Sequence, residues 1–335
     1  MRLLVTGAAG FIGANFARFW LSRHPADHLV ALDLLTYAGN EANLTDIAGD
    51  ITFVRGDIGN QPAVEALLRE HAIEVVVNFA AESHNSLAVV DPGRFFATNV
   101  LGTQRLLEAC RLVGIGRFHH VSTCEVYGDL ALDDPAAFTE SSCYRPRTPY
   151  NASKAGSDHA VRAYHETFGL PVTITNCSNN YGPYQFPEKA IPLFTTRALT
   201  GRPLPVYASS ACRREWLHVD DHCRAIERVL LAGRLGATYN VGSGVEASIA
   251  DLAGAILGLL GLPSSMIEIV PDRPGHDRRY LLDSSLIRAE LAWAPQVDFE
   301  SGLAATVNWY ASHRDWWEPL LRRAVVDEGG WHPVA

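Results

Sequence analysis

Two short stretches carry side chains that could catalyse a reaction. Residues 121–128 read VSTCEVYG and residues 150–154 read YNASK, so a hydroxyl, a thiol, a carboxylate, a phenol and an amine lie close in the chain. Groups of these kinds in one pocket serve general acid–base catalysis. The candidate catalytic residues are therefore Thr123, Cys124, Glu125, Tyr150 and Lys154. We interpret the chain as an enzyme.

The phenol and the amine form a recognisable pair. Lys154 follows Tyr150 by about one helical turn, which puts both side chains on the same helix face. A cation beside the phenol oxygen makes loss of its proton easier, and the Thr123 hydroxyl could hydrogen-bond the same oxygen. Alternatively, the two residues are an ordinary pair on a helix surface.

The chain begins with elements that suit a dinucleotide. Residues 2–6 are an apolar run, residues 7–13 read GAAGFIG, and residues 14–22 have helical periodicity. Glycines allow a tight turn and a close backbone approach, and the helix N-terminus then faces the pyrophosphate. The spacing is GxxGxxG rather than GxGxxG, so this turn alone is weak evidence.

An acidic residue strengthens the prediction. A second strand, residues 28–33, ends in Asp33 about twenty residues after the glycine turn, where a carboxylate can accept from both ribose hydroxyls. Asp33 would repel a 2′-phosphate and no arginine follows it before Asn40, which favours NAD over NADP. Alternatively, Asp33 only caps the loop that follows.

Further strands alternate with helical stretches. We predict them at residues 51–55, 75–81, 118–122 and 172–177. The fold class is then α/β, a Rossmann-like doubly wound parallel sheet, and the polar residues after each strand converge on one crevice. The alternation becomes irregular later, so we expect an NAD-binding domain over 1–178 and mainly a smaller substrate-binding lobe over 179–335, with some segments returning to the first domain.

Composition excludes several classes of protein. Among 335 residues, 47% are hydrophobic, 19% are charged and the net charge is −9, so no basic surface is expected for nucleic acid. No signal peptide or run long enough to span a bilayer is apparent, which predicts a cytoplasmic protein. The six cysteines show neither CxxC pairs nor zinc-ligand spacing, so we expect reduced thiols and no metal.

With these residues assembled, the chain resembles the extended short-chain dehydrogenase/reductase family of nucleotide-sugar enzymes, and within it the dTDP-glucose 4,6-dehydratases. The resemblance covers almost the whole chain. Besides the stretches already named, it rests on the motifs at residues 33–40, 80–84, 179–189, 214–219 and 273–280. The run NNYGPYQFPEK at 179–189 is the most specific of them.

The chain also departs from that subgroup. Cys124 stands where an Asp is usual, and residues 85–88 read NSLA where Val-Asp-Arg-Ser is usual. Residues 208–210 replace a usual Gly-Asp-Gly turn, and Ile249 falls near a usual substrate-binding Asn. These changes bear on the substrate and on the reaction.

The resemblance implies an NAD-dependent nucleotide-hexose 4,6-dehydratase that makes a 4-keto-6-deoxy sugar. Tyr150 and Lys154 would serve oxidation at carbon 4, Glu125 would remove the proton at carbon 5, and water would leave from carbon 6. Cys124 is either the acid for that step, since a thiol is protonated at neutral pH, or a packing residue. A 5,6-dehydratase and a 4-epimerase are the alternatives, and a non-catalytic nucleotide-binding relative is a third.

The resemblance and the positions of the strand ends also imply binding residues. For the cofactor these are Gly7, Gly10, Phe11, Ile12, Gly13, Asp33, Leu34, Leu35, Thr36, Asp57, Ile58, Phe79, Ala80, Ala81, Ser83, Thr98, Tyr150, Lys154 and Asn180. For the nucleotide-sugar substrate they are Ser83, His84, Asn179, Glu188, Lys189, Pro205, Tyr207, Arg214, His276 and Tyr280. The resemblance further implies a homodimer through helices near residues 102–112 and 153–168.

Overall fold

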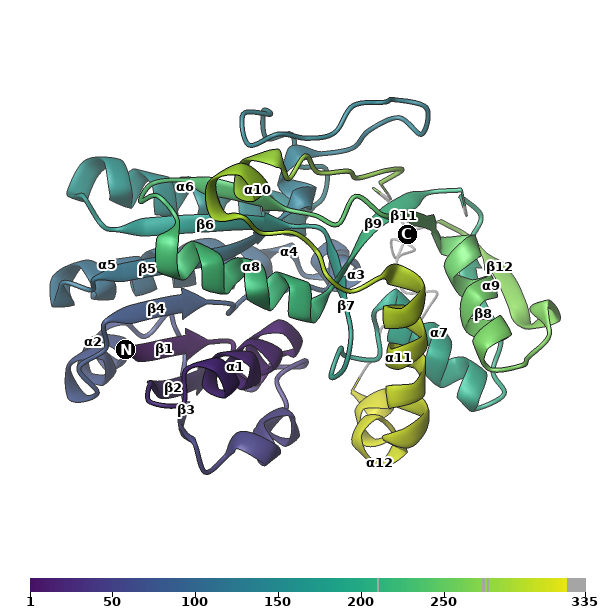
Figure 1. Cartoon of the computed structure of the whole chain (residues 1–335), viewed down its shortest axis with the longest axis horizontal. Coiled ribbons are helices and arrows are strands. Elements are labelled where there is room, and N and C mark those ends of the chain that lie inside the picture. Colours follow the sequence, from purple (N-terminus) through teal and green to yellow (C-terminus); the bar gives the residue numbers. More distant parts are fainter. Residues whose placement is uncertain (210, 273–274, 276, 324–335) are drawn as a thin grey trace.

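A seven-stranded sheet forms the larger part of the chain (Figure 1). The computed structural model describes residues 1–209, 211–272, 275 and 277–323. The strand order is β10-β6-β5-β4-β1-β2-β3, and every neighbouring pair is parallel. The strands are β1 (Arg2–Thr6), β2 (His28–Asp33), β3 (Ile51–Arg55), β4 (Val75–Asn78), β5 (Arg117–Thr123), β6 (Val172–Cys177) and β10 (Thr238–Val241). The Rossmann-like α/β prediction is confirmed.

Helices cover both faces of this sheet because its strands are apolar on both sides. Leu3 and Val5 of β1 pack on one face, against α1 (Phe11–Arg23) and α8 (Val219–Ala232). Leu4 between them points to the other face, against α2 (Gln61–Glu70), α5 (Thr103–Val113) and α6 (Pro149–Phe168). The two-residue period of a strand thus fills two separate cores.

Two of these helices begin in ways that matter for the site. The N-terminus of α1 follows Gly10 and has no side-chain cap, so its first N–H groups remain available to a ligand. In contrast, α6 is capped by Thr148, whose hydroxyl accepts from the backbone N–H of Asn151, and Pro149 is its first residue. Tyr150 and Lys154, the candidate catalytic pair, are therefore carried on a well-capped helix.

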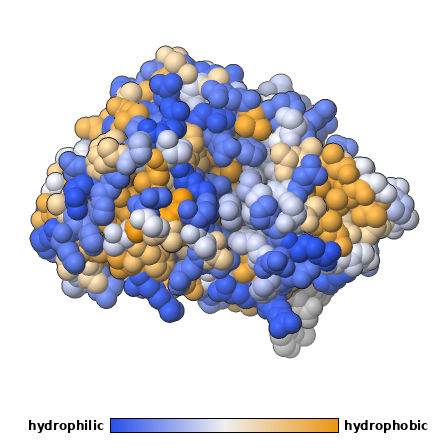
Figure 2. All heavy atoms as spheres, turned by 60° about the horizontal axis from the view of Figure 1, so that its bottom comes forward, coloured by the Kyte–Doolittle hydropathy of each residue, from blue (hydrophilic) through white to orange (hydrophobic). Residues whose placement is uncertain are grey.

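The smaller lobe lies at the right of Figure 1. It contains a sheet of order β11-β9-β7 and a pair β12-β8, packed with three helices around one apolar cluster. Its elements are β7 (Asn179–Tyr181), β8 (Leu204–Tyr207), β9 (Arg213–His218), β11 (Glu246–Ser248), β12 (Ile267–Val270), α7 (Ala190–Leu199), α9 (Ile249–Leu259) and α11 (Phe299–Ser312). Figure 2 shows a hydrophobic area at the right, over this lobe, on a face that is otherwise mixed.

Short helices complete the described chain. They are α3 (Asn85–Val90), α4 (Pro92–Phe95), α10 (Ser285–Leu291) and α12 (Arg314–Trp317), and a π-helical turn spans Phe96–Gly102. Four 3₁₀ helices in the described chain span Glu41–Ile47, Cys124–Tyr127, Ser264–Met266 and Pro319–Arg322. Within the described ranges, no helix is long and apolar enough to cross a membrane, and no group of three or more His, Cys, Asp or Glu could hold a metal.

Candidate active site

The glycine turn after β1 has the shape that close ligand approach requires. Gly7 has a φ of 64°, and a Cβ there would lie 2.7 Å from the backbone nitrogen of Ala80. A Cβ at Gly13 would lie 2.3 Å from the carbonyl oxygen of Gly7. These positions accept only glycine without rearrangement, and the turn leads straight into the uncapped start of α1. Such a cradle suits a pyrophosphate.

Asp33 lies at the end of β2, on the same cavity. Its Oδ2 accepts from the backbone N–H of Ala9 at 2.9 Å and its Oδ1 from that of Leu35 at 2.7 Å. The carboxylate therefore organises the glycine turn and caps its own loop, while it still lines the cavity. Burial raises the pKa of Asp33, although both backbone hydrogen bonds act in the opposite direction.

A cavity of about 370 Å³ runs along the carboxyl ends of the strands. Eighteen of the nineteen residues predicted for the cofactor line it, and Leu35 is the exception. Leu35 has a φ of 58° and packs against the core beneath α1, because this left-handed conformation turns its side chain away from the crevice. The cavity and its glycine cradle fit a dinucleotide.

Four of the five candidate catalytic residues line this cavity together: Thr123, Glu125, Tyr150 and Lys154. Tyr150 is 9% exposed and Lys154 is 4% exposed. The pKa of Tyr150 is raised well above its usual value, first by burial and then by the charge of Glu125, whereas a hydrogen bond to Thr123 lowers it. The phenol is thus neutral unless a cation offsets these effects.

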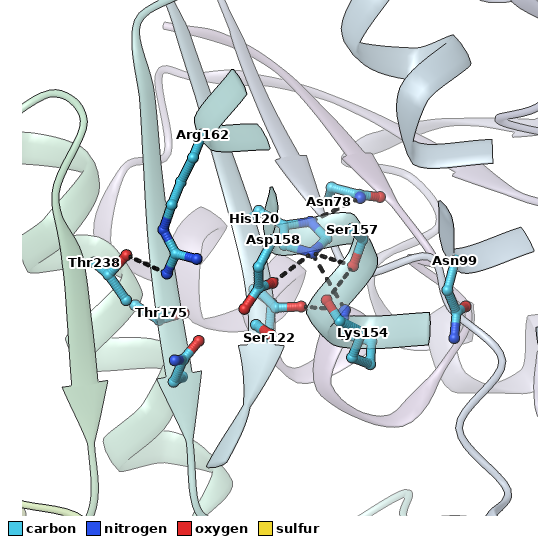
Figure 3. Close-up of polar contacts among 12 residues, drawn as sticks. Asn78, Asn99, His120, Ser122, Lys154, Ser157, Asp158, Arg162, Thr175 and Thr238 are labelled. Atoms are coloured by element: carbon cyan, nitrogen blue, oxygen red, sulfur yellow. Dashed lines mark hydrogen bonds and ion pairs between the residues drawn. The ribbon is translucent and has the colours of Figure 1, made fainter. Parts of the chain in front are cut away.

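Lys154 supplies that cation from a buried polar network (Figure 3). Its Nζ donates to the carbonyl of Val121 at 2.8 Å and lies 3.3 Å from His120 Nε2. Asp158 lies one turn along the helix, with Oδ1 3.5 Å from the same imidazole nitrogen. Burial lowers the pKa of Lys154, and the charge of Asp158 opposes that shift.

His120 itself stays neutral in this network. Burial lowers its pKa well below the usual value, and the neighbouring Lys154 lowers it further. Asn78 Nδ2 lies 3.1 Å from His120 Nδ1, and the hydroxyl of Ser157 lies 3.2 Å from Nε2. Burial also raises the pKa of Asp158, and the charge of Lys154 opposes that shift. Lys154 and Asp158 therefore favour each other's charged forms, and both lie near His120 Nε2.

A second cavity, of about 300 Å³, opens between the sheet and the smaller lobe. Eight predicted substrate residues line it: His84, Asn179, Glu188, Lys189, Pro205, Tyr207, Arg214 and Tyr280. Ser83 lines only the first cavity, and His276 lies outside the described residues. Glu125, Asn179, Asn180, Glu188 and Lys189 are among the residues that line both cavities. The two spaces therefore meet beside Glu125.

Glu188 and Lys189 contact residues on the other side of this junction. The Glu188 carboxylate accepts from the phenol of Tyr37 at 3.0 Å and lies 3.2 Å from His84 Nε2. Lys189 Nζ lies 3.3 Å from Glu188 Oε1 and donates to the carbonyl of Ser83 at 2.7 Å. Burial raises the pKa of Glu188. These contacts join the loop after β4 to the start of α7.

Arg214 on β9 is fixed on the far side of the second cavity. Its guanidinium donates to the carbonyl of Asp277 at 2.7 Å and stacks 4.8 Å from the ring centre of Tyr280. The phenol of Tyr280 donates to the carboxylate of Asp277. Arg214 is only 6% exposed, so its orientation is set before a ligand arrives.

Cys124 differs from its neighbours because it lines neither cavity. It is 1% exposed and packs with Val126, Tyr127, Ala155, Tyr280 and Leu282. Burial raises the pKa of the thiol well above its usual value, and the charge of Glu125 adds to this. This environment favours the packing role over the acid role.

The structure also brings in residues that the sequence did not single out. They are Tyr37, Gly39, Asn85, Cys177, Ser178, Gln185, Phe186, Phe194 and Trp216. Tyr37 and Gly39 lie inside the motif at 33–40, Gln185 and Phe186 inside 179–189, and Trp216 inside 214–219, so motif membership was a signal for these five. Asn85 carried a different signal, since it departs from the expected motif.

Comparisons with known proteins agree with this geometry. The family model described as GDP-mannose 4,6 dehydratase matches residues 4–306. A dTDP-glucose 4,6-dehydratase of Xanthomonas campestris pv. campestris is 50% identical, with 95% of each chain covered. One of Mycobacterium tuberculosis is 49% identical, with 96% of each chain covered.

Solved structures give the same picture. DesIV, a dTDP-glucose 4,6-dehydratase from Streptomyces venezuelae with NAD bound, is 51% identical, with a TM-score of 0.92 over 96% of this chain and 100% of that one. A UDP-glucose 4-epimerase from Thermus thermophilus, in complex with NAD, is 31% identical, with a TM-score of 0.86 over 93% of this chain and 100% of that one. The prediction of an NAD-dependent nucleotide-sugar hydro-lyase is confirmed, and the chain belongs to the GDP-mannose 4,6 dehydratase family of nucleotide-sugar enzymes.

Proposed function

We propose that this protein converts dTDP-glucose to dTDP-4-keto-6-deoxyglucose by using tightly bound NAD. The observation that carries the proposal is that Tyr150, Lys154 and Glu125 share one cavity, and that Glu125 also lines the second cavity. A phenol–amine pair serves oxidation, and a carboxylate beside it serves proton removal from the next carbon. The relatives named above as dTDP-glucose 4,6-dehydratases support this choice of substrate.

Oxidation at carbon 4 is assigned to Tyr150 and Lys154. The phenolate takes the proton of the carbon 4 hydroxyl, Lys154 stabilises the phenolate, and Thr123 hydrogen-bonds the same oxygen. The glycine turn and Asp33 hold NAD, which accepts the hydride from carbon 4 and later returns it to carbon 6. Burial of Tyr150 and Lys154 keeps water away while this pair works.

Elimination of water is assigned to Glu125. The new ketone makes the carbon 5 hydrogen acidic, and Glu125 removes it as a proton. Because Cys124 packs away from both cavities, Glu125 also passes this proton to the hydroxyl leaving carbon 6, and the two depart together as water. Glu125 must then be protonated again before it protonates carbon 5. The proton left on Tyr150 balances that requirement.

The second cavity holds the nucleotide diphosphate part of the substrate in this proposal. Lys189 and Arg214 supply positive charge from opposite sides, and a guanidinium can bind two phosphate oxygens at once. We divide the chain at residue 178, so that the sugar lies between an NAD-binding domain and a lobe that supplies these cations. Glu188 positions Lys189 through their ion pair.

Two quaternary and cellular assignments belong to the same proposal. We infer a homodimer through α5 and α6, which pack on each other. Each helix carries an exposed apolar residue, Leu112 (47% exposed) on α5 and Phe168 (52% exposed) on α6. All six cysteines are free, which suits a reducing compartment, and we assign the protein to the cytoplasm.

The alternatives remain distinct reactions. A 4-epimerase needs only Tyr150 and Lys154, and it leaves no role for Glu125 at the junction. A 5,6-dehydratase would return the hydride to carbon 4 and leave an exocyclic alkene, and the absence of an Asp at position 124 is the observation that favours it.

Mass spectrometry of the product, combined with a reagent that traps keto sugars, tests the proposal. The substrates are dTDP-glucose and a small panel of UDP-hexoses. Loss of one water with a trappable ketone is the expected result. Loss of water without a ketone would indicate the 5,6-alkene, and an altered sugar of unchanged mass would indicate epimerisation.

A further inference from the structure

Asn85 lies where the two cavities meet, beside the carboxylate of Glu125. Both residues line both cavities. Asn85 is the first residue of α3, and its Nδ2 donates to Glu125 Oε2 at 3.2 Å. An ionised carboxylate only accepts, so this contact fixes which end of the amide faces Glu125.

The other end of the amide is tied to the helix that carries Tyr150. The hydroxyl of Thr148 donates to Asn85 Oδ1 at 3.4 Å and accepts from the N–H of Asn151 at 3.2 Å. These directions are consistent, because a hydroxyl has one proton to donate and lone pairs to accept. Thr148 caps α6, and Tyr150 lies in its first turn. One chain of contacts therefore links the carboxylate to the phenol's helix.

The amide donor lies where this chain departs from the pattern that it resembles. Where the related pattern has Val-Asp-Arg-Ser, this chain has Asn85-Ser-Leu-Ala88. Valine at position 85 could not donate a hydrogen bond to Glu125. The same chain lacks the usual Asp at position 124, so more of the proton transfer falls on Glu125.

We propose that Asn85 is a positioning residue that holds Glu125 for proton transfer between carbon 5 and the hydroxyl leaving carbon 6. The inference rests on the proposed function and deepens it. The C5–H bond breaks and its proton goes to Glu125, then the electron pair forms the C5–C6 double bond as the C6–O bond breaks. The proton leaves with that hydroxyl as water. The Asn85 amide neither gains nor loses a proton.

The other groups that face Glu125 decide how a pH profile is read. Its charge raises the pKa of Cys124, Cys177, Tyr150 and Tyr280, all of which are buried, so none of these titrates at acidic pH. Lys154 shares the first cavity with Glu125, and Arg214 shares the second. Glu215, whose charge acts on Cys124, has a pKa raised to about 7, so the variants are compared with wild type at each pH.

Two substitutions test the proposal. Asn85→Leu removes the amide at similar volume, and Asn85→Asp replaces the donor by a second carboxylate. We expect each to slow solvent-deuterium incorporation at carbon 5 by roughly tenfold to a hundredfold, because a positioned proton transfer contributes at least that much. Oxidation at carbon 4, followed by the absorbance of the reduced cofactor, and KM should stay within about threefold.

The pH profile separates positioning from simple loss of structure. A like charge beside a carboxylate disfavours its ionised form, so in Asn85→Asp the acid limb of the exchange rate should move to higher pH by about one unit. Asn85→Leu should move it less in the same direction. Asn308→Asp, at an exposed position on α11, is the matched control and should behave as wild type.

Other outcomes overturn the inference. Exchange at carbon 5 that matches the Asn308→Asp control would show that Glu125 does not need the amide. If the rates of oxidation and exchange fell equally and KM rose by the same factor, the substitution would have unfolded α3 locally, and Asn85 would have no specific role in positioning Glu125. Deuterium exchange at carbon 5 requires oxidation at carbon 4 but not release of a product. It therefore still tests the role of Asn85 if the wild-type protein makes no keto sugar. That last result would instead overturn the proposed function.

Discussion

The oxidation side and the elimination side of the site are held in different ways. Tyr150 and Lys154 share one long helix, and Lys154 is surrounded by buried partners that include His120 and Asp158. Glu125 lies on a short turn, Cys124–Tyr127, and reaches an amide from α3. A helix of 20 residues therefore carries the residues proposed for oxidation, whereas the base proposed for elimination lies on a turn of four residues and contacts an amide from another helix.

The largest expected effect comes from the oxidation side. Tyr150→Phe removes the base for the carbon 4 hydroxyl and should reduce cofactor reduction by roughly 10³-fold, within the range known for general bases. Rapid-mixing absorbance of the reduced cofactor measures it. Tyr164→Phe, on the same helix but outside both cavities, is the matched control. Normal cofactor reduction in Tyr150→Phe would contradict the assignment.

Glu125→Gln breaks the other side selectively. We expect deuterium incorporation at carbon 5 to fall by about 10²-fold while oxidation at carbon 4 continues, because the carboxylate acts only after the ketone forms. Mass spectrometry of recovered sugar measures the exchange. Glu166→Gln, exposed on α6, serves as the control. Unchanged exchange in Glu125→Gln would mean that another group is the base.

The difference between the oxidation side and the elimination side also decides how much of the site could be predicted from the sequence. The glycine turn, Asp33, Tyr150 and Lys154 follow from motifs at strand ends and one helical turn, so short-range spacing places them. The strand at 172–177 was also predicted within its observed bounds. Leu35 was predicted to line the cofactor cavity but packs in the core, since a left-handed residue interrupts the expected direction of the loop.

The features that the sequence could not predict depend on contacts between distant segments of the chain. Asn85 and Glu125 are 40 positions apart, and Tyr37 and Glu188 are 151 apart, so no local pattern reports that they touch. The smaller lobe was recognised only by its irregularity, because strands as short as β7 and β11 carry too few residues for a period. Tertiary packing decides these features.

Asp158→Asn tests the buried network under Lys154. Removing the carboxylate lowers the pKa of Lys154 further, because burial already lowers it and Asp158 opposes that effect. Lys154 must be protonated to stabilise the phenolate, so the alkaline limb of kcat should move to lower pH by about one unit. Tyr144→Phe removes a hydrogen bond to Asp158 but keeps its charge, and should leave the limb in place. Identical limbs in both variants would argue against a counter-charge role.

The raised pKa of Glu215, whose charge acts on Cys124 next to the proposed base, predicts that the stability of the folded protein depends on pH. Burial raises its pKa to about 7 from a usual 4.5, and its carboxylate accepts from the N–H groups of Gly244 and Leu282. The pKa of Glu215 is higher in the folded state than in the unfolded state, so folding is favoured while Glu215 is protonated. This contribution to stability is fully present below pH 4.5 and is lost as the pH rises to about 7. The loss is about 3 kcal/mol. Glu215→Gln should flatten Tm between these pH values, as measured by calorimetry, and an unchanged slope would contradict this.

The smallest effect on rate is expected at Cys124, although it lies next to the base. Cys124→Ala removes a thiol that packs among Val126, Tyr127 and Leu282, so Tm should fall by a few degrees while kcat stays within about threefold. If the thiol were the acid for water loss, kcat would fall by about 10²-fold with oxidation intact. Cys124→Asp adds a second test, since a carboxyl group placed against this apolar cluster should cost stability without raising dehydratase activity. A gain in activity would show that position 124 reaches the sugar, and the elimination side would then have two proton donors rather than one.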